Sequence, residues 1–156
     1  MYIPKHFEVT DVEVMLDLIR DYPLASLVAH STKGLNANHI ALHLEDKPTP
    51  FGVLQGHVLR SNPLLDDISE EVEILTDQNG APFSEPLAVA DAPSDFTDKL
   101  LPSIIGIEMK ITKLLGKWKV SQNQPHENHE SVIAGLKVTK QLGAEKMAEF
   151  VKLAPK

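Results

Sequence analysis

The sequence contains no cysteine. Disulfides, thiolate catalysis and any zinc or iron–sulfur site built on cysteine are therefore excluded. It also lacks an apolar run close to the roughly 18–20 residues that cross a bilayer, and its first residues lack the basic-then-apolar plan of a signal peptide. These features predict a soluble cytoplasmic protein without a membrane segment.

Basic residues are also scarce. The 22 acidic and 15 basic residues give a formal net charge of −7, whereas a free-standing nucleic-acid binder usually carries a basic stripe that neutralises phosphates. The nearest cationic group is interrupted by apolar residues and consists of Lys110, Lys113, Lys117 and Lys119. The charge therefore disfavours direct nucleic-acid binding by a monomer.

Several signatures of catalysis and nucleotide binding are missing. No glycine-rich G-x-G-x-x-G or Walker turn is present, so the usual nucleotide cradles are absent. No Ser/His/Asp arrangement or carboxylate pair stands at a fixed spacing. His126 and His129, with Glu127 and Glu130, fall at the start of a predicted helix and are interpreted as a solvated helix end.

The composition is that of one globular domain. The 156 residues are 42% hydrophobic and 24% charged, enough apolar material for a single core over residues 1–156. The apolar spacing, prolines and glycines predict helices over residues 11–21, 94–101, 125–136 and 143–153, and strands over residues 24–30, 35–44, 52–60, 71–75, 104–112 and 117–121. Tight turns between the strands favour an α+β fold around an antiparallel sheet or barrel.

His39 and His43 have the H-x-x-x-H spacing that places two metal ligands on one helix face. Residues 35–44 alternate as a strand, however, with Ile40, Leu42 and Leu44 on the opposite side. On a strand the two histidines lie roughly 13 Å apart, too far to share an ion. They therefore either line a ligand cavity or simply face solvent.

Gln55 and His57 share a face of the next predicted strand, and Arg60 stands at its end. An arginine fork suits phosphate, while glutamine and histidine can bond the heteroatoms of a ring. This face is consistent with an anionic aromatic ligand and equally with an ordinary exposed surface.

Residues 117–121 alternate in the same way. Lys117, Lys119 and Ser121 share one face, which suits phosphate contact, while Trp118 and Val120 face the other side. The only tryptophan is interpreted as a core anchor rather than a stacking platform.

Several sequence blocks, taken together and in this order, resemble the PaiB family. They are residues 1–7, residues 37–44, residues 52–58 followed by Arg60 and Asn62-Pro63, Asp91-Ala92-Pro93 with Phe96, residues 99–108, and Gly116-Lys117-Trp118-Lys119-Val120-Ser121-Gln122-Asn123. The blocks cover most of residues 1–136 and are specific as a set, although each is weak alone.

The resemblance implies an FMN-binding split barrel related to pyridoxamine-phosphate-oxidase-like flavoproteins, forming a homodimer with flavin near the subunit interface. The family is described as negative regulators of transcription, tied to protease production and sporulation. Because the charge disfavours DNA contact, regulation is expected to be indirect. Two alternatives stay open: a flavin-dependent oxidoreductase of a small cytoplasmic substrate, and a flavin-free interaction module.

The resemblance also implies the site residues. His57 and Arg60 are expected near the ligand, with Lys117, Lys119 and Ser121 making phosphate or ring contacts. A second group of expected contacts is His39, His43, Gln55, Gln122 and Asn123. No catalytic residue and no metal ligand is expected.

One departure from the family is large. Between residue 75 and the block at residues 91–93, the family carries a long aromatic-rich segment with further barrel strands, which this sequence lacks near residues 75–77. Either the segment is mobile and missing from the sequence, which is the favoured hypothesis, or the chain truly lacks it. A true deletion would expose sheet edges and make FMN binding doubtful.

Overall fold

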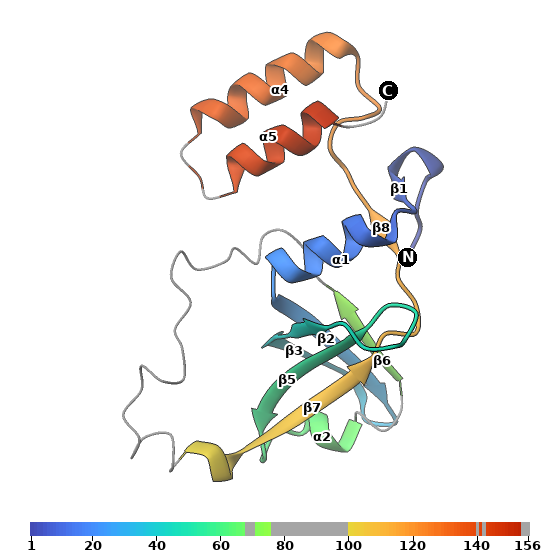
Figure 1. Ribbon diagram of the computed structural model, residues 1–156, viewed down its shortest axis with the longest axis vertical. Coiled ribbons are helices and arrows are strands. Elements are labelled where there is room, and N and C mark those ends of the chain that lie inside the picture. The colour runs from blue at the N-terminus through green and yellow to red at the C-terminus, as the bar shows by residue number, and fades with distance from the viewer. Residues whose placement is uncertain (68–70, 76–99, 140, 142, 154–156) are drawn as a thin grey trace. The chain divides into compact units, whose positions relative to one another are not determined.

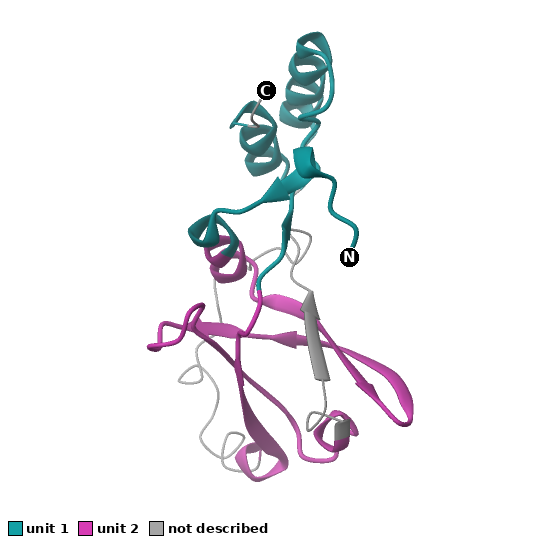
Figure 2. Ribbon diagram, turned by 90° about the vertical axis from the view of Figure 1, so that its right-hand side faces the viewer, with its two compact units in different colours: residues 1–15, 114–156 teal, residues 16–113 magenta. Residues whose placement is uncertain are grey.

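A computed structural model of the chain describes residues 1–67, 71–75, 100–139, 141 and 143–153 (Figure 1). The chain divides into two compact units, shown in different colours in Figure 2. Unit 1 comprises residues 1–15 and 114–156, and unit 2 comprises residues 16–113. Across the described ranges, every helix is too short or too polar to span a bilayer.

In its described residues, unit 2 contains two three-stranded antiparallel sheets. The first has the order β3–β2–β6 and the second the order β4–β5–β7. The strands are β2 (Leu24–Ser31), β3 (Gly34–Ala41), β4 (His43–Glu45), β5 (Val53–Leu59), β6 (Glu71–Leu75) and β7 (Ile104–Lys110). The structure confirms the predicted combination of helices with antiparallel sheets. Most of the predicted strand positions are also confirmed.

One run of chain belongs to both sheets. β3 pairs with β2 and β4 pairs with β5, and only Leu42 separates β3 from β4. The Leu42 N–H donates to the Pro23 carbonyl at 2.8 Å, which continues the register of β3 with β2 by one residue before the chain turns into β4. The single strand predicted over residues 35–44 is therefore split at this bend, in the way that strands switch sheets at a corner. Its predicted alternation is confirmed, because Ile40, Leu42 and Leu44 are buried while His39 and His43 are exposed.

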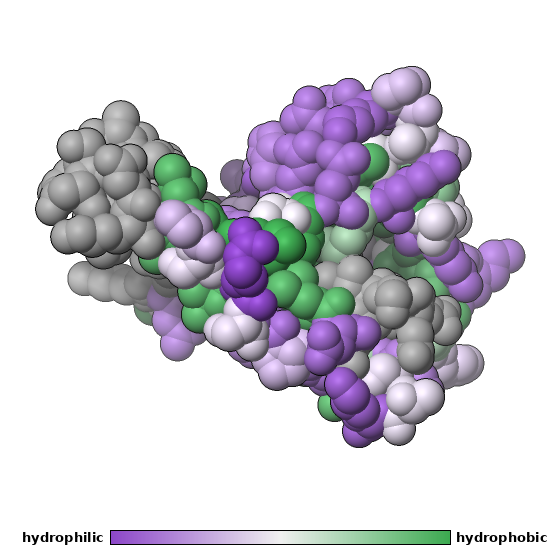
Figure 3. Space-filling view, turned by 90° about the horizontal axis from the view of Figure 1, so that it is seen from below, coloured by the Kyte–Doolittle hydropathy of each residue, from purple (hydrophilic) through white to green (hydrophobic). Residues whose placement is uncertain are grey.

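The core of unit 2 lies on the inner faces of these strands. Leu27 in β2 and Leu64 at the start of the short helix α2 (Leu64–Asp67) are fully buried. The Asn62 side chain positions α2, since its Oδ1 accepts the Leu64 N–H at 2.9 Å and its Nδ2 donates to Asn38 Oδ1 at 3.1 Å. Some apolar residues remain at the surface, as the face in Figure 3 shows.

Gly52 allows the loop between β4 and β5 to close. Its φ is +78°, a region that side chains of L residues rarely adopt. A Cβ at this position would lie 2.8 Å from the Glu45 carbonyl oxygen. Both the backbone angle and the close approach therefore require glycine.

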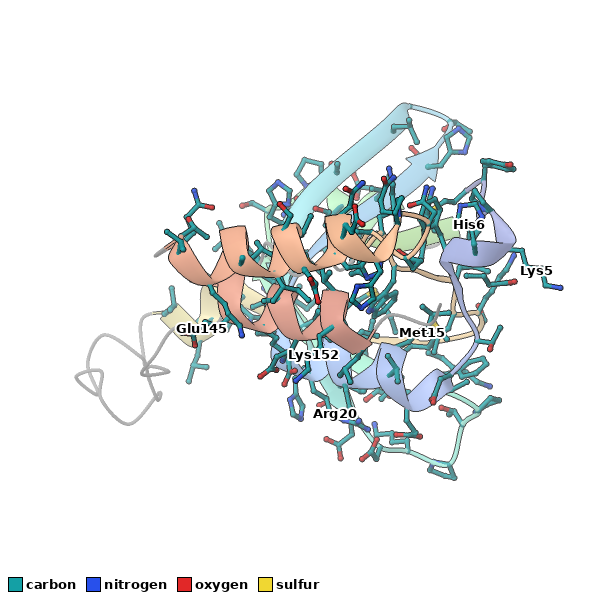
Figure 4. The ribbon with its side chains drawn as sticks, turned by 90° about the horizontal axis from the view of Figure 1, so that it is seen from above. Lys5, His6, Met15, Arg20, Glu145 and Lys152 are labelled. Atoms are coloured by element: carbon teal, nitrogen blue, oxygen red, sulfur yellow. The ribbon has the colours of Figure 1, made fainter. Side chains whose placement is uncertain are left out.

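Unit 1 is built from a two-stranded pair and a helical hairpin. β1 (Glu8–Val9) pairs with β8 (Gly116–Lys117), after the short helix η1 (Lys5–Phe7). α4 (His126–Val138) and α5 (Ala144–Leu153) form the hairpin. α5 buries Ala144, Ala148 and Val151, with Glu145 near its beginning and Lys152 near its end (Figure 4), an order that complements the helix dipole.

Helix α1 (Val12–Asp21) begins where the sequence predicts. Asp11 caps it, because its Oδ1 accepts the N–H groups of Glu13 and Val14 at 3.0 and 3.3 Å. The helix ends two residues before Pro23, as expected from the restriction that proline places on the residue before it. The boundary between the two units falls inside this helix.

Three sequence predictions need correction or fall outside the structure. The strand predicted over residues 117–121 ends at Lys117, because Gln122 takes the Val120 N–H and the Trp118 carbonyl. The helix predicted over residues 94–101, like the join near residues 75–77, lies largely or wholly outside the described residues; the 3-10 helix η3 (Leu101–Ser103) follows.

Candidate functional site

The sheet β4–β5–β7 brings three polar side chains into one row. His43, Gln55 and Glu108 are register partners across the three strands. Gln55 Nε2 donates to Glu108 Oε2 at 2.9 Å, and the Lys47 ammonium donates to the same carboxylate oxygen. His43 is exposed, with its Nε2 3.6 Å from Glu45 Oε2. Two of the predicted residues, His43 and Gln55, are thus neighbours.

His57 lies two residues further along β5 on the same face. Its register partner on β7 is Gly106, where an added Cβ would meet nothing within 4 Å. His57 is exposed and Gln55 is partly exposed. The sheet therefore leaves open space at Gly106, bordered by an imidazole and an amide that can bond a ring heteroatom.

The other two predicted residues of unit 2 lie apart from this row. Arg60 follows the end of β5, where its Nε donates to the Pro102 carbonyl and its Nη2 to the Ile104 carbonyl, both at 3.2 Å. His39 belongs to the other sheet, with its Nδ1 2.9 Å from Ser26 Oγ. Arg60 thus joins the end of β5 to the start of β7, and His39 is a cross-strand partner of Ser26.

Beside His43, a hollow of about 470 Å³ is lined by Arg20, His43, Leu44, Glu45 and Asp46. Arg20 contacts Asp17 at 2.8 Å and Asp46 at 3.2 Å, and these carboxylates, Asp17 first, raise its pKa. The guanidinium is therefore already neutralised by two carboxylates. In the described part of the chain, no group of three or more His, Asp or Glu side chains is placed to hold a metal ion.

Glu108 and Lys47 were not identified from the sequence, although they organise the polar row. The Lys47 ammonium, and secondarily the Gln55 amide, lower the pKa of Glu108 below its ordinary value of 4.5. Folding lowers the pKa of Glu108. The ionised carboxylate therefore adds to the free energy of unfolding above pH 4.5, and this stabilisation is lost as the pH falls through the folded-state pKa.

We expect Lys47→Ala to raise the pKa of Glu108 toward its ordinary value, and Gln55→Ala to raise it by less. An NMR pH titration of the Glu108 carboxyl carbon measures both changes. Lys33→Ala is the matched control, because Lys33 pairs with Asp66 instead, at 3.4 Å. An unchanged Glu108 pKa in Lys47→Ala would contradict the assigned contact.

The remaining predicted residues lie in unit 1, around a second hollow. It measures about 380 Å³ and is lined by Phe7, Lys119, Ser121, Asn123 and Gln124. The Lys119 ammonium lies 5.8 Å from the centroid of the Phe7 ring, within cation–π range. Lys117 instead donates from Nζ to the Tyr2 carbonyl at 3.0 Å. Lys119, Ser121 and Asn123 therefore share one hollow, while Lys117 anchors the N-terminal segment.

Gln122 is turned back onto the chain. Its Oε1 accepts the Val120 N–H at 2.8 Å and its Nε2 donates to the Trp118 carbonyl at 2.6 Å. His129 Nε2 lies 2.6 Å from the Ser121 carbonyl oxygen, to which it must donate. His129 is thus partly buried against this turn rather than part of a fully solvated helix end. Trp118 is only partly buried, so its role as a core anchor is correct only in part.

The N-terminal half of the chain, which contributes β2 to β5 and the polar row on β4 and β5, is similar to a known family. Residues 1–76 match the family model described as "Putative FMN-binding domain". The match covers 76 of 156 residues, just under half of the chain, and it supports a flavin-binding protein.

Two fungal relatives, both named as uncharacterised proteins, match the chain. The one from Emericella nidulans is 33% identical over 79 residues, covering 49% of this chain and 32% of the relative. The one from Aspergillus fumigatus is 33% identical over 82 residues, covering 52% of this chain and 30% of the relative. The matched stretch is therefore about a third of the length of either relative.

Proposed function

We propose that the chain is an FMN-binding protein that holds the flavin ring on the β4–β5–β7 face of unit 2. The observation that carries this proposal is the family match, because residues 1–76 include His43, Gln55 and His57. The polar row of unit 2 is consistent with it. FMN bound there would bring electron-transfer chemistry to the protein.

The residues present fit such a ring. The open space at Gly106 leaves room for a planar group against the sheet. His57 and Gln55 border it on β5, and Glu108 borders it on β7. An imidazole and an amide can bond the oxygen and nitrogen atoms of an isoalloxazine edge.

The finer assignments suggested by the resemblance belong to the same proposal. They are a split barrel, a homodimer, and a PaiB-like regulator of transcription that acts indirectly. Flavin occupancy, rather than DNA contact, would then be the regulatory signal, in keeping with the net charge of −7. A mobility-shift assay at physiological salt tests this part, since a direct shift of promoter DNA would overturn indirect control.

Gly106→Val is expected to block FMN binding without impairing the fold. The new side chain would fill the open space, while valine suits a strand with free space beside it. We expect at least a tenfold weaker Kd, corresponding to about 1.4 kcal/mol. Fluorescence quenching of FMN on titration with protein measures it, with thermal unfolding as the check on folding.

Ala37→Val is the matched control, because Ala37 is an exposed small residue in β3 of the other sheet. It is expected to bind FMN as the wild type does.

His57→Ala should weaken FMN binding by up to about tenfold, the value of one hydrogen bond. His30→Ala, which removes an exposed histidine on β2, is the control and should leave binding unchanged. Wild-type protein that fails to bind FMN at micromolar concentration would refute the proposal.

A further inference from the structure

The turn at residues 121–124 of unit 1 has an unusual backbone. Ser121 has a φ of 62° and is the only residue other than glycine with a positive φ in the part of the chain that the structure describes. A serine in this left-handed region carries a conformational cost. The cost is offset by bonds that fix the turn on both sides, from Gln122 to Trp118 and Val120 and from His129 to the Ser121 carbonyl.

The turn type follows from the same angles. The Gln124 N–H donates to the Ser121 carbonyl at 2.8 Å, which closes a four-residue turn. Types I′, II and II′ all need a positive φ at one of the central residues, and neither Gln122 nor Asn123 has one. Negative φ at both central residues together with the closing hydrogen bond matches type I, which has right-handed backbone at its first central residue. Gln122 is therefore right-handed directly after the positive φ of Ser121.

When two successive residues have backbone conformations of opposite handedness, their N–H groups and that of the next residue point into one concavity. Such a concavity is called a nest, and it binds anions. In this nest the donors are the N–H groups of Ser121, Gln122 and Asn123. In the described residues, none of these three N–H groups donates to a protein acceptor. The neighbouring N–H groups of Val120 and Gln124 do, to Gln122 Oε1 and to the Ser121 carbonyl. Three backbone donors are thus left for a ligand.

The side chains around the nest match the same chemistry. Lys119 is exposed on the hollow and brings a positive charge, Ser121 adds a hydroxyl, and the Phe7 ring forms an apolar wall. Charge-assisted bonds from N–H groups and an ammonium are the contacts that hold phosphate oxygens. We propose that the hollow lined by Phe7, Lys119, Ser121, Asn123 and Gln124 binds the phosphate group of a phosphate monoester.

The phosphate site is made of other residues than those proposed to hold the flavin ring. Of the lining residues, only Phe7 falls within the matched residues 1–76. Acidic Glu127 and Glu130 lie on the first turns of α4, so the affinity for a lone phosphate ion is expected to be modest. We expect a Kd of about 1 mM for inorganic phosphate.

The test is an NMR titration of the full chain with inorganic phosphate at constant ionic strength, with chloride as the reference anion. The amide signals of residues 121–123 are expected to shift saturably with phosphate only. Lys119→Ala should weaken the affinity by about tenfold, and Lys119→Arg should restore most of it. Lys137→Ala, an exposed lysine on α4, is the control and should change nothing.

A separate pair of variants tests the backbone of the nest. Ser121→Gly keeps the positive φ and should retain phosphate binding to within about tenfold, because only the hydroxyl is lost. Ser121→Pro locks φ near −65° and should abolish binding while far-UV circular dichroism stays unchanged. A Ser121→Pro variant that binds phosphate like wild type, or wild-type amides that do not shift, would refute the site.

FMN and riboflavin separate the phosphate site from the proposed flavin function. If FMN shifts the amides of residues 121–123 and riboflavin does not, the phosphate bound here is that of FMN. If FMN fails to bind but phosphate shifts these amides, the nest stands and the flavin proposal fails. If FMN binds and neither FMN nor phosphate shifts them, the flavin proposal stands and the nest is refuted.

Discussion

Replacing Gly52 with alanine is expected to lower the free energy of unfolding by about 3 kcal/mol. Two costs combine at this position. The φ of +78° strains any residue that has a Cβ, and the Cβ itself would lie 2.8 Å from the Glu45 carbonyl oxygen. That oxygen belongs to the backbone at the end of β4, so the clash cannot be relieved by a side-chain rotation. Urea unfolding followed by far-UV circular dichroism measures the change.

Two other glycines of unit 2 separate the two costs. Gly34 has a φ of +108° but open space where a methyl group would be added, so Gly34→Ala should cost only the strain, about 1–2 kcal/mol. Gly106 has neither a positive φ nor a close neighbour, so Gly106→Ala should be neutral or slightly stabilising. Equal losses in all three variants would show that the close approach at Gly52 is not what matters.

Leu64→Ala is expected to cost about 3 kcal/mol, as large-to-small changes in a core do. The Leu64 side chain is fully buried at the start of α2, where the Asn62 side chain holds the first turn. Because Asn62 also holds Asn38 of β3, the surrounding residues are tied in place and cannot easily close around the cavity. Thermal and urea unfolding should both report the loss.

Leu59→Ala removes the same atoms from a side chain that is 55% exposed. Its expected effect is within about 0.5 kcal/mol. The pair of variants therefore compares one chemical change in two environments only a few residues apart. Similar losses for the two leucines would mean that α2 does not pack into the core as described.

Local patterns predicted most of the elements correctly. The alternation of residues 35–44 placed Ile40, Leu42 and Leu44 in the core, and the prolines and capping residues placed the ends of α1. The bend at Leu42 could not be predicted, because it depends on the change of partner strand from β2, which pairs with β3, to β5, which pairs with β4. The strand predicted over residues 117–121 does not continue past Lys117, because the Gln122 side chain bonds the Val120 N–H and the Trp118 carbonyl that a strand would use for pairing. The apolar periodicity of a sequence does not reveal such a side-chain contact.

The candidate sites were predicted in part for a similar reason. Gln55 and His57 were correctly placed on one face, since strand alternation is a local property. Their neighbours Glu108 and Gly106 come from β7, about fifty residues later, and only the strand register brings them together. Phe7 likewise reaches Lys119 through the pairing of β1 with β8. Sequence spacing carries no information about such pairings.

The single tryptophan has a practical consequence for measuring cooperativity. Trp118 belongs to unit 1, and unit 2 contains no tryptophan. Tryptophan emission, excited at a wavelength where tyrosine does not absorb, therefore follows the unfolding of unit 1 alone, whereas circular dichroism sums helices and strands from both units. Coincident transitions by the two probes would mean that the units unfold as one cooperative system, and separate transitions would assign a stability to each.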